Sequence, residues 1–528
     1  MNLIRRDFLK IAAIAGTGAL AGFSPLSTSK RGNFRRFSLC TNTAILNSHP
    51  DFLNLIESSG ITDVWMPLFL NGYWPYPIED ILQWKKKIEK KGIAVHSLSV
   101  PFGHPGNSLG GAHDFESTPK HWPRCVDIDG NKYSGTSVHP IITEENISVI
   151  QKISQSGFKK LFLDDDFRLA RTPGMIGGCF CSEHQNEFIS KYGYGEKDWV
   201  QLKQDIKDRN LSSTLNDWIN FNCDQLTFSF RAQQSATPEV ALGIMVMYLG
   251  SEKAGIRLSD YKGSPMRVGE LMFEDRAFNP IKGKTDELFS ALFHRRFVSP
   301  EMAYSETTAY PANKLSAKNM AAKLHISTIC DIRNTMMMSG LEPFPLTHWS
   351  TLAPVMKKVA AMHQKIAGHK FHGPFKHYWG ESSRMVGNDK PYSLFLAAGI
   401  PFEVTETPAS DGWTFLSDFE VKDVDSGKLK SKGTKFVYGT NADKKLNVVR
   451  YLPEILTDIY AFKHEILPHL KGIPYVEEDK PVVCAWYPAI KTVLLWNLSE
   501  TRESFTVNMD GKKHTVEMGG LDSELITI

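Results

Sequence analysis

The segment "KKLFLDDDFRL" (159–169) joins an apolar run, typical of a buried strand, to three consecutive aspartates. Carboxylates that lie side by side repel one another, and they lose hydration wherever they are buried. A strand that ends in three of them therefore needs a reason. Because side chains alternate along a strand, we expect Asp164 and Asp166 to share one orientation and Asp165 to take the other.

This strand is one of eight that the sequence pattern predicts. Helical patterns lie between most of them, for example at 78–91, 143–157, 184–235 and 314–339. Eight such units predict a (β/α)8 TIM barrel over residues 33–365, in which the three aspartates end the fourth strand. The predicted strands are 36–41, 63–69, 94–100, 159–166, 241–249, 266–273, 297–306 and 342–349.

The pattern changes after residue 365. Shorter strand and helix patterns between 366 and 478 predict a smaller α/β domain. The last segment, 479–528, alternates apolar and polar residues around a turn signal at Asp510-Gly511. This alternation is typical of a small antiparallel β-domain.

The composition is that of a soluble globular protein. Of its 528 residues, 42% are hydrophobic and 23% are charged, which indicates a full core and two or three domains. The formal net charge of +3 includes several basic residues of the N-terminus. The rest of the chain is nearly neutral and gives no electrostatic support for a nucleic-acid partner.

The N-terminus, "MNLIRRDFLKIAAIAGTGALAGFSPLSTS", predicts an export signal over residues 1–30. The pair Arg5-Arg6 before a weakly apolar stretch, 11–23, is similar to the twin-arginine signal of proteins that are exported already folded. A membrane anchor is the alternative, but that stretch is shorter than the roughly 20 residues that a span needs. We expect a periplasmic protein without stable membrane insertion after signal cleavage.

A second carboxylate ends the seventh predicted strand, at Glu306. In a barrel of this kind the strand ends meet at one mouth, so Glu306 and the aspartates are expected to face one another. Two facing carboxylates are the minimal equipment for glycoside hydrolysis, where one donates a proton and the other attacks or activates water. Arg168 could keep a neighbouring carboxylate ionised. A divalent-cation site and a capped, solvated loop remain alternatives.

Three further residues are candidates for substrate contact, together with Asp164 and Arg168. Trp74 follows the second predicted strand and Trp349 ends the eighth, and a flat aromatic face at the mouth suits stacking on a sugar ring. Glu274 directly follows the sixth strand. Taken alone, each aromatic residue is more typical of the core or of ordinary surface packing.

With the aspartates, "GGCFCSEHQNEF" (177–188) and "SETTAYPANKLSAKNMAAKLHISTICDIRNTMM" (305–337), the chain resembles the bacterial β-galactosidases of glycoside hydrolase family 42. The resemblance implies a catalytic barrel, a flavodoxin-like trimerisation domain over 366–478, a small C-terminal β-sandwich domain over 479–528, and a homotrimer.

The resemblance also implies roles for individual residues. The family's Asn-Glu-Tyr segment matches Asp165-Asp166-Phe167, which gives the acid role to Asp166 with Asp165 beside it, and the family's nucleophile matches Glu306. Aspartate is one methylene shorter than glutamate, and the asparagine before the acid is replaced. We therefore expect activity on a sugar other than galactose, with retaining and inverting stereochemistry both open.

Some members of that family carry a zinc cluster, and the resemblance implies one here. The matching residues are Cys125 in the loop after the third strand, and Cys179, Cys181 and His184 after the fourth. Three thiolates and one imidazole suit one structural Zn²⁺. Ordinary thiols or a disulfide at Cys125 are the alternatives, and no organic cofactor is expected.

Together these features predict an exported glycoside hydrolase that acts on oligosaccharides or on fragments of polysaccharides. One alternative is a metal-dependent hydrolase or lyase that uses the aspartates as cation ligands. Another alternative is a sugar-binding protein without catalytic activity.

Overall fold

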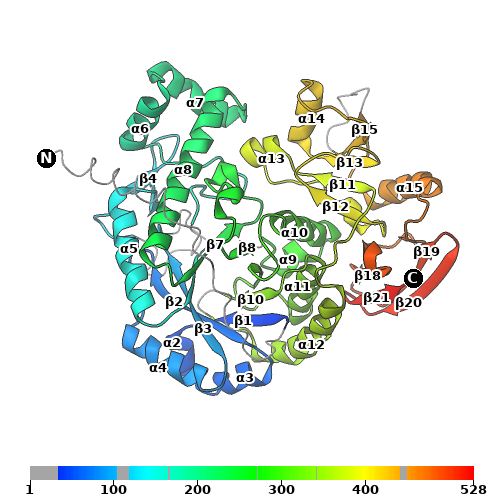
Figure 1. Cartoon of the computed structure of the whole chain (residues 1–528), viewed down its shortest axis with the longest axis horizontal. Helices are drawn as coiled ribbons and strands as arrows, with labels where there is room; N and C mark the ends of the chain where they lie inside the picture. Colours follow the sequence, from blue (N-terminus) through cyan, green and yellow to red (C-terminus); the bar gives the residue numbers. More distant parts are fainter. Residues whose placement is uncertain (1–33, 104–117, 165–166, 270, 340–341, 440–448) are drawn as a thin grey trace. The chain divides into compact units, whose positions relative to one another are not determined.

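A closed barrel of eight parallel strands forms the first part of the chain (Figure 1). The computed structural model describes residues 34–103, 118–164, 167–269, 271–339, 342–439 and 449–528. Going round the barrel, the order is β1-β10-β9-β8-β7-β6-β3-β2, so strands that follow one another along the chain are neighbours. The strands are β1 (Arg36–Cys40), β2 (Asp63–Leu70), β3 (Ala94–Val100), β6 (Lys160–Leu163), β7 (Ala241–Met247), β8 (Met266–Gly269), β9 (Ala303–Thr308) and β10 (Asn334–Met338).

The barrel prediction is confirmed, but the eighth predicted strand is wrong. The last strand, β10, lies inside the segment 314–339 that the pattern assigned to a helix, because the helix ends early, at Ile329. The segment 342–349 contains a short 3-10 helix, η5 (Leu346–His348), and the start of α12. Pro343 and Pro345 lack the N–H that a strand interior needs, which explains why this segment is no strand.

Helices cover the outside of the barrel, and the single helix expected over 184–235 is three helices, α6, α7 and α8. The chain turns after α6 at Gly193 and after α7 at Arg209, both with left-handed backbone. The loop after β3 carries a two-stranded hairpin, β4 (Arg124–Val126) and β5 (Lys132–Thr136). The helical elements are α2 (Thr43–Ser48), α3 (Phe52–Ser58), α4 (Ile78–Glu89), α5 (Pro140–Gln155), α6 (Ser182–Tyr192), α7 (Glu196–Asp208), α8 (Ser213–Ala236), η3 (Glu252–Ala254), η4 (Leu258–Tyr261), α9 (Asp275–Phe278), α10 (Ile281–His294), α11 (Ala317–Ile329) and α12 (Trp349–Ile366).

Large side chains fill the barrel interior. The ring centroids of Trp65 and Phe162 lie 4.8 Å apart, and those of Phe162 and Tyr304 lie 4.9 Å apart. Since side chains alternate along a strand, the residues two positions after Phe162 and Tyr304 face the same interior, nearer the C-terminal end of the strands. These residues are Asp164 and Glu306.

The second sheet has five parallel strands in the order β12-β11-β13-β14-β15, which is the order of a flavodoxin-like domain and confirms that prediction. Its strands are β11 (Phe375–Tyr378), β12 (Phe402–Thr405), β13 (Trp413–Leu416), β14 (Lys435–Tyr438) and β15 (Val449–Tyr451). Its helical elements are α13 (Glu381–Val386), η6 (Leu394–Ala397), α14 (Asp418–Asp425), α15 (Leu456–Ile466) and η7 (Leu467–His469).

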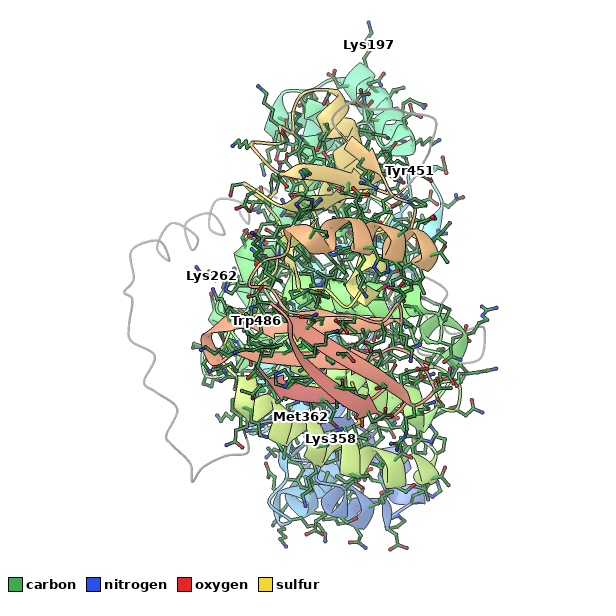
Figure 2. All side chains as sticks on the ribbon, turned by 90° about the vertical axis from the view of Figure 1, so that its right-hand side faces the viewer. Lys197, Lys262, Lys358, Met362, Tyr451 and Trp486 are labelled. Carbon is green, nitrogen blue, oxygen red and sulfur yellow. The ribbon has the colours of Figure 1, made fainter. Side chains whose placement is uncertain are left out.

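The C-terminal strands form two antiparallel sheets of three strands each, as the alternating pattern predicted. Asp510 and Gly511 join β19 to β20 with positive φ angles of 50° and 87°, the backbone of a tight hairpin turn. Lys358 and Met362 of α12 lie against this domain (Figure 2), and the Lys358 ammonium is 2.8 Å from Asp522. The strands are β16 (Tyr475–Val476), β17 (Val482–Tyr487), β18 (Thr492–Asn497), β19 (Glu503–Met509), β20 (Lys512–Met518) and β21 (Ser523–Thr527), and η8 (Pro488–Ile490) follows β17.

The domain boundaries expected at 365 and 478 stay predictions, and one strand pairing crosses the second of them. β16 precedes residue 478 but pairs with β19 of the C-terminal domain. The export signal expected over 1–30 lies outside the described residues. Among the described residues, no helix has the length and apolar character that crossing a membrane requires.

The aromatic residues at the start of the α/β domain pack inside the chain. Phe375 is fully buried and stacks on Trp413, with ring centroids 4.9 Å apart. Trp379 is 1% exposed and packs edge-on against Phe289 of α10. These rings do not offer the exposed aromatic surface that would support a subunit contact, so the expected homotrimer stays a prediction without them.

Candidate active site and His/Cys cluster

A buried ion cluster joins Asp164 to Glu306 through Arg267, which lies on β8. The Arg267 side chain is fully buried, and its Nη2 donates a hydrogen bond to Asp164 Oδ1. Its Nε lies 3.2 Å from Glu306 Oε2. One guanidinium group therefore contacts both Asp164, which follows the fourth strand of the barrel, and Glu306, which lies on the seventh.

The barrel strands fix the backbone on both sides of this cluster. The amide of Asp164 donates a hydrogen bond of 2.8 Å to the Ser99 carbonyl at the end of β3. Glu306 lies within β9 opposite Met336 of β10, and the Thr308 hydroxyl donates a hydrogen bond to its Oε1. The two carboxylates are 7% and 3% exposed. Glu306 lies within a strand and Asp164 directly follows one, so both positions are set by the barrel, as a precise catalytic pair requires.

The surroundings of Arg267 are apolar. The sulfur atoms of Met245 and Met336 each lie 2.9 Å from its guanidinium nitrogens, and the ring of Phe162 is 5.7 Å from its central carbon. Burial also raises the pKa of the neighbouring Cys40 thiol to about 12, so that thiol stays neutral. Attraction between unlike charges is strong in such surroundings, because little water screens it.

Arg267 was not among the residues singled out from the sequence. The available signal was one arginine within the strand pattern "MRVGELMF", where a charge is unusual if the residue faces the core. The sequence pointed instead to Arg168. In the structure Arg168 is 4% exposed, and its Nε donates a hydrogen bond of 2.9 Å to the Ala170 carbonyl.

Asp165 and Asp166 lie outside the described residues, so the catalytic roles expected for them stay predictions. Asp164, expected to contact substrate, faces the barrel interior and binds Arg267.

The predicted sugar-contact residues lie apart from this cluster or in the core. The prediction that Trp349 ends a barrel strand is wrong, because it is the first residue of α12 and is 2% exposed. Trp74 packs edge-on against Phe69, and the Lys152 ammonium lies 4.6 Å above its ring. Glu274 directly precedes α9 without a capping hydrogen bond from its side chain, and it pairs with Arg276 at 3.2 Å.

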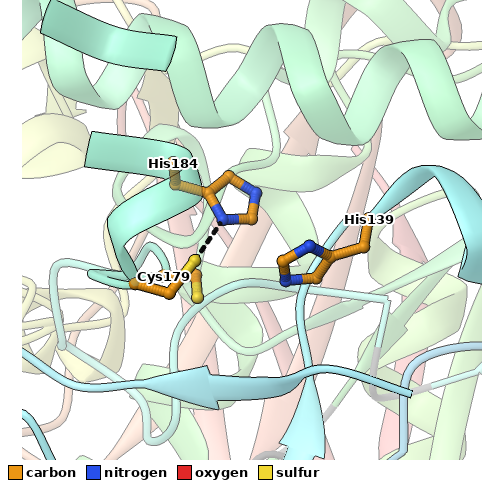
Figure 3. Close-up of side chains that lie close together, drawn as sticks. His139, Cys179 and His184 are labelled. Carbon is orange, nitrogen blue, oxygen red and sulfur yellow. Dashed lines mark hydrogen bonds between the residues drawn. The ribbon is translucent and has the colours of Figure 1, made fainter. Parts of the chain in front are cut away.

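A second cluster joins two cysteines to two histidines (Figure 3). One ligand atom from each of Cys179, Cys181, His184 and His139 lies within 4.8 Å of the others. Cys181 and His184 open α6, and His139 precedes α5 at its N-terminal end. Three members match the prediction from the sequence, whereas His139 was missed because it lies far from the cysteines in the chain.

The fourth predicted ligand, Cys125, lies beside this cluster rather than within the group of four. Its Sγ is 3.9 Å from the Gly178 carbonyl, and a hydrogen bond with Cys179 is the main cause that raises its pKa. The same hydrogen bond from Cys125 lowers the pKa of the Cys179 thiol, with a further contribution from Cys181. All seven cysteines are free, so Cys125 forms no disulfide.

The donor set fits a tetrahedral metal ion such as Zn²⁺. His184 Nε2 lies 3.0 Å from the Val138 carbonyl, which leaves Nδ1 facing Cys181 Sγ at 3.1 Å. His139 Nδ1 lies 3.4 Å from Glu183 Oε2, and its buried Nε2 has no hydrogen-bond partner among the described residues. Metal-binding histidines are commonly oriented by such a carbonyl or carboxylate on the other ring nitrogen.

No family model matches the sequence, and no curated protein is similar to it. Solved structures, in contrast, match nearly the whole chain. A β-galactosidase from Bacillus circulans sp. alkalophilus matches with a TM-score of 0.61 and 9% identity over 94% of this chain and 99% of that one. A cold-adapted β-galactosidase from Rahnella sp. R3 matches with a TM-score of 0.59 and 10% identity over 94% of this chain and 98% of that one.

A third structure, the β-galactosidase from the psychrophilic Marinomonas ef1, gives a TM-score of 0.55 at 8% identity over 93% of this chain and 99% of that one. The three matches extend over the barrel, the α/β sheet and the C-terminal β-domain. At such low identity they establish a common fold and not a common substrate. The resemblance to bacterial β-galactosidases is thus confirmed as one of fold along nearly the entire chain.

Proposed function

We propose that the protein is a glycoside hydrolase in which Glu306 is the nucleophile or the base. The observation that carries this proposal is the position of Glu306, which faces the barrel interior from the seventh strand and contacts a buried arginine. Catalytic groups of this fold lie at the C-terminal ends of the strands. The likeness in fold to three β-galactosidases supports the same reaction class.

Hydrolysis needs a second group that donates a proton to the leaving oxygen. Asp166 remains our assignment for this acid, with Asp165 as its neighbour, on the basis of the family resemblance. If the carboxyl groups prove to be about 5 Å apart the enzyme is retaining, and a separation of about 6.5–9.5 Å makes it inverting. The substrates that we propose are oligosaccharides or fragments of polysaccharides, and the sugar that is cleaved off is one other than galactose.

The metal-dependent alternative receives no support from Asp164 and Glu306. A divalent cation shared by these two carboxylates would need the position that the Arg267 guanidinium occupies. We assign metal instead to the His/Cys cluster. There we propose one structural Zn²⁺ that holds together the start of α6 and the N-terminus of α5.

We also propose export through the twin-arginine route to the periplasm, on the basis of the N-terminal sequence. A structural zinc site assembled before export fits this route, because such substrates cross the membrane folded. The homotrimer stays a proposal from the family resemblance. Light scattering on the mature protein tests it, since a mass of one chain would contradict it.

The experiment that tests the function compares wild type with Glu306→Gln on a panel of aryl glycosides and plant or algal oligosaccharides. We expect turnover by wild type and its loss in Glu306→Gln. Glu301→Gln is the matched control, because Glu301 precedes the same strand but is exposed and pairs with Arg333. Equal turnover in Glu306→Gln and Glu301→Gln would refute the proposed role of Glu306.

A further inference from the structure

Arg267 occupies the centre of the candidate active site and has no assigned role. We propose that Arg267 is a positioning residue that holds Glu306 as a charged nucleophile or base and takes Asp164 as its second counter-ion, so that Asp164 is not the proton donor. This inference rests on the proposed function. It keeps Glu306 as the nucleophile or base and gives Asp164, which the sequence marked as a substrate contact, the task of a counter-ion.

The geometry of the guanidinium group carries the first step. Its Nε side faces Glu306, while Nη2 donates to Asp164, so the two carboxylates contact different parts of one rigid, planar group. In the part of the chain that the structure describes, these are the carboxylates that pair with Arg267. A rigid group that donates a hydrogen bond to Asp164 on one side and forms an ion pair with Glu306 on the other keeps Glu306 close to the end of the fourth strand.

The surroundings carry the second step. Arg267 is fully buried, and Met245, Met336 and Phe162 line its remaining sides. A guanidinium is a cation in proteins, and a positive charge favours the ionised form of each carboxylate that it contacts. Glu306 is therefore kept in the form that a nucleophile or base requires.

The chemistry of the acid carries the third step. A general acid must hold a proton in the resting enzyme, which requires a raised pKa. A hydrogen bond from a buried guanidinium has the opposite effect, because it lowers the pKa of the carboxylate that accepts it. Asp164 thus has the wrong environment for a proton donor and the right one for fixing Arg267.

The first test uses kinetics as a function of pH. Replacing the cation in Arg267→Met is expected to raise the pKa of Glu306, so the acidic limb of the kcat/KM profile should move upward by about one pH unit or more. Arg267→Lys, which keeps a cation, should show a smaller upward shift of this limb than Arg267→Met. If the limb does not move in Arg267→Met, the positioning role is refuted.

Asp164→Asn separates a counter-ion from an acid. We expect it to hydrolyse aryl glycosides with good and poor leaving groups with similar, modest losses of about tenfold or less, because no proton donor has been removed. Two results together would make Asp164 the acid and overturn the assignment. The first is a large loss of turnover only on substrates with poor leaving groups, and the second is an increase in turnover by azide on substrates with good leaving groups.

The second test does not depend on turnover. Arg267→Met should lower the melting temperature of wild type, because it leaves two buried carboxylates without their cation. In the Asp164→Asn/Glu306→Gln background the same change should raise it, because it removes a buried, unpaired cation. An equal decrease in both backgrounds would show that the three groups are not coupled and would overturn the inference.

Lys323 and Glu287, a second fully buried pair at 2.7 Å, provide the control for this cycle. Arg267→Met should lower the melting temperature equally with and without Lys323→Met/Glu287→Gln, because that pair does not contact Arg267. Failure of the proposed function is distinguishable from failure of this inference. A wild type without turnover on any glycoside refutes the function and with it a catalytic role of Arg267, even if the reversal in melting temperature is found.

Discussion

Replacing His139 by alanine is expected to release the metal from the His/Cys cluster, whereas replacing Cys125 by serine should leave it bound. The reason is the geometry, which places His139 in the group of four and leaves Cys125 outside it; the buried Nε2 of His139 also has no hydrogen-bond partner among the described residues. The two variants therefore distinguish the ligand set of the structure from the set that the family resemblance implied.

The magnitude follows from the loss of one ligand among four. Loss of a partner that merely orients a ligand weakens metal binding 10–100-fold, so loss of a ligand should cost at least about 100-fold, or about 2.7 kcal/mol. Since metal that binds the folded chain stabilises it, the same free energy is lost from folding at fixed zinc concentration. At about 2 °C per kcal/mol, the melting temperature of His139→Ala should fall by about 5 °C.

The assay is metal content per chain together with thermal unfolding, on protein purified without chelators. We expect about one zinc in wild type and Cys125→Ser, and far less in His139→Ala. His121→Ala is the matched control, because His121 is exposed and pairs with Glu145 at 2.7 Å. Retention of zinc in His139→Ala with its loss in Cys125→Ser would refute the geometric assignment. Absence of zinc from wild type would refute the metal site itself.

Three further predictions concern pH, packing and metal removal. Burial lowers the pKa of four histidines, among them His377, to about 4, so between pH 6.5 and 4 the unfolded chain binds protons that the folded chain does not. The melting temperature should therefore fall as the pH drops through this window. His377→Asn should reduce the slope of melting temperature against pH by about a quarter. Trp65→Ala, which empties the barrel centre, should lower the free energy of unfolding by about 3–5 kcal/mol in urea titrations, and Trp65→Phe by less. Chelation should reduce turnover and the melting temperature together, and re-addition of zinc should restore both; full turnover in zinc-free protein would show that the cluster does not support the active site.

Seven of the eight barrel strands could be found from the sequence, because a parallel strand that is buried on both faces gives a short, continuous apolar run. The eighth, "NTMMM" at 334–338, differs in composition. Methionine favours helices, and the run follows α11 after a short turn at Asp331, whose positive φ of 49° leaves no mark in the hydrophobic pattern. The two prolines at 343 and 345 argued against the segment 342–349, which was predicted as the eighth strand instead.

The candidate site was only partly accessible from the sequence. Asp164 and Glu306 could be found because strand ends are where this fold places its chemistry. Arg267 could not, because a charge within a strand faces either side and the pattern does not say which. His139 was missed for a related reason. Its proximity to Cys179 is created by the fold, and spacing along the chain carries no sign of it.

The segment between Asp164 and Cys179 connects the ion cluster to the His/Cys cluster. Its backbone is fixed at Leu169, whose amide donates to Ala254, and at Gly178, whose amide donates to Leu169. Gly178 has a φ of 123°, and a Cβ there would lie 2.4 Å from the Trp218 ring, so glycine is required. Over its described residues 167–179, this segment is thus held at two points beside the side chains of the proposed metal site. We therefore expect a zinc ion at the cluster to stabilise these residues, which is a structural task and separate from the bond cleavage that we propose for the carboxylates.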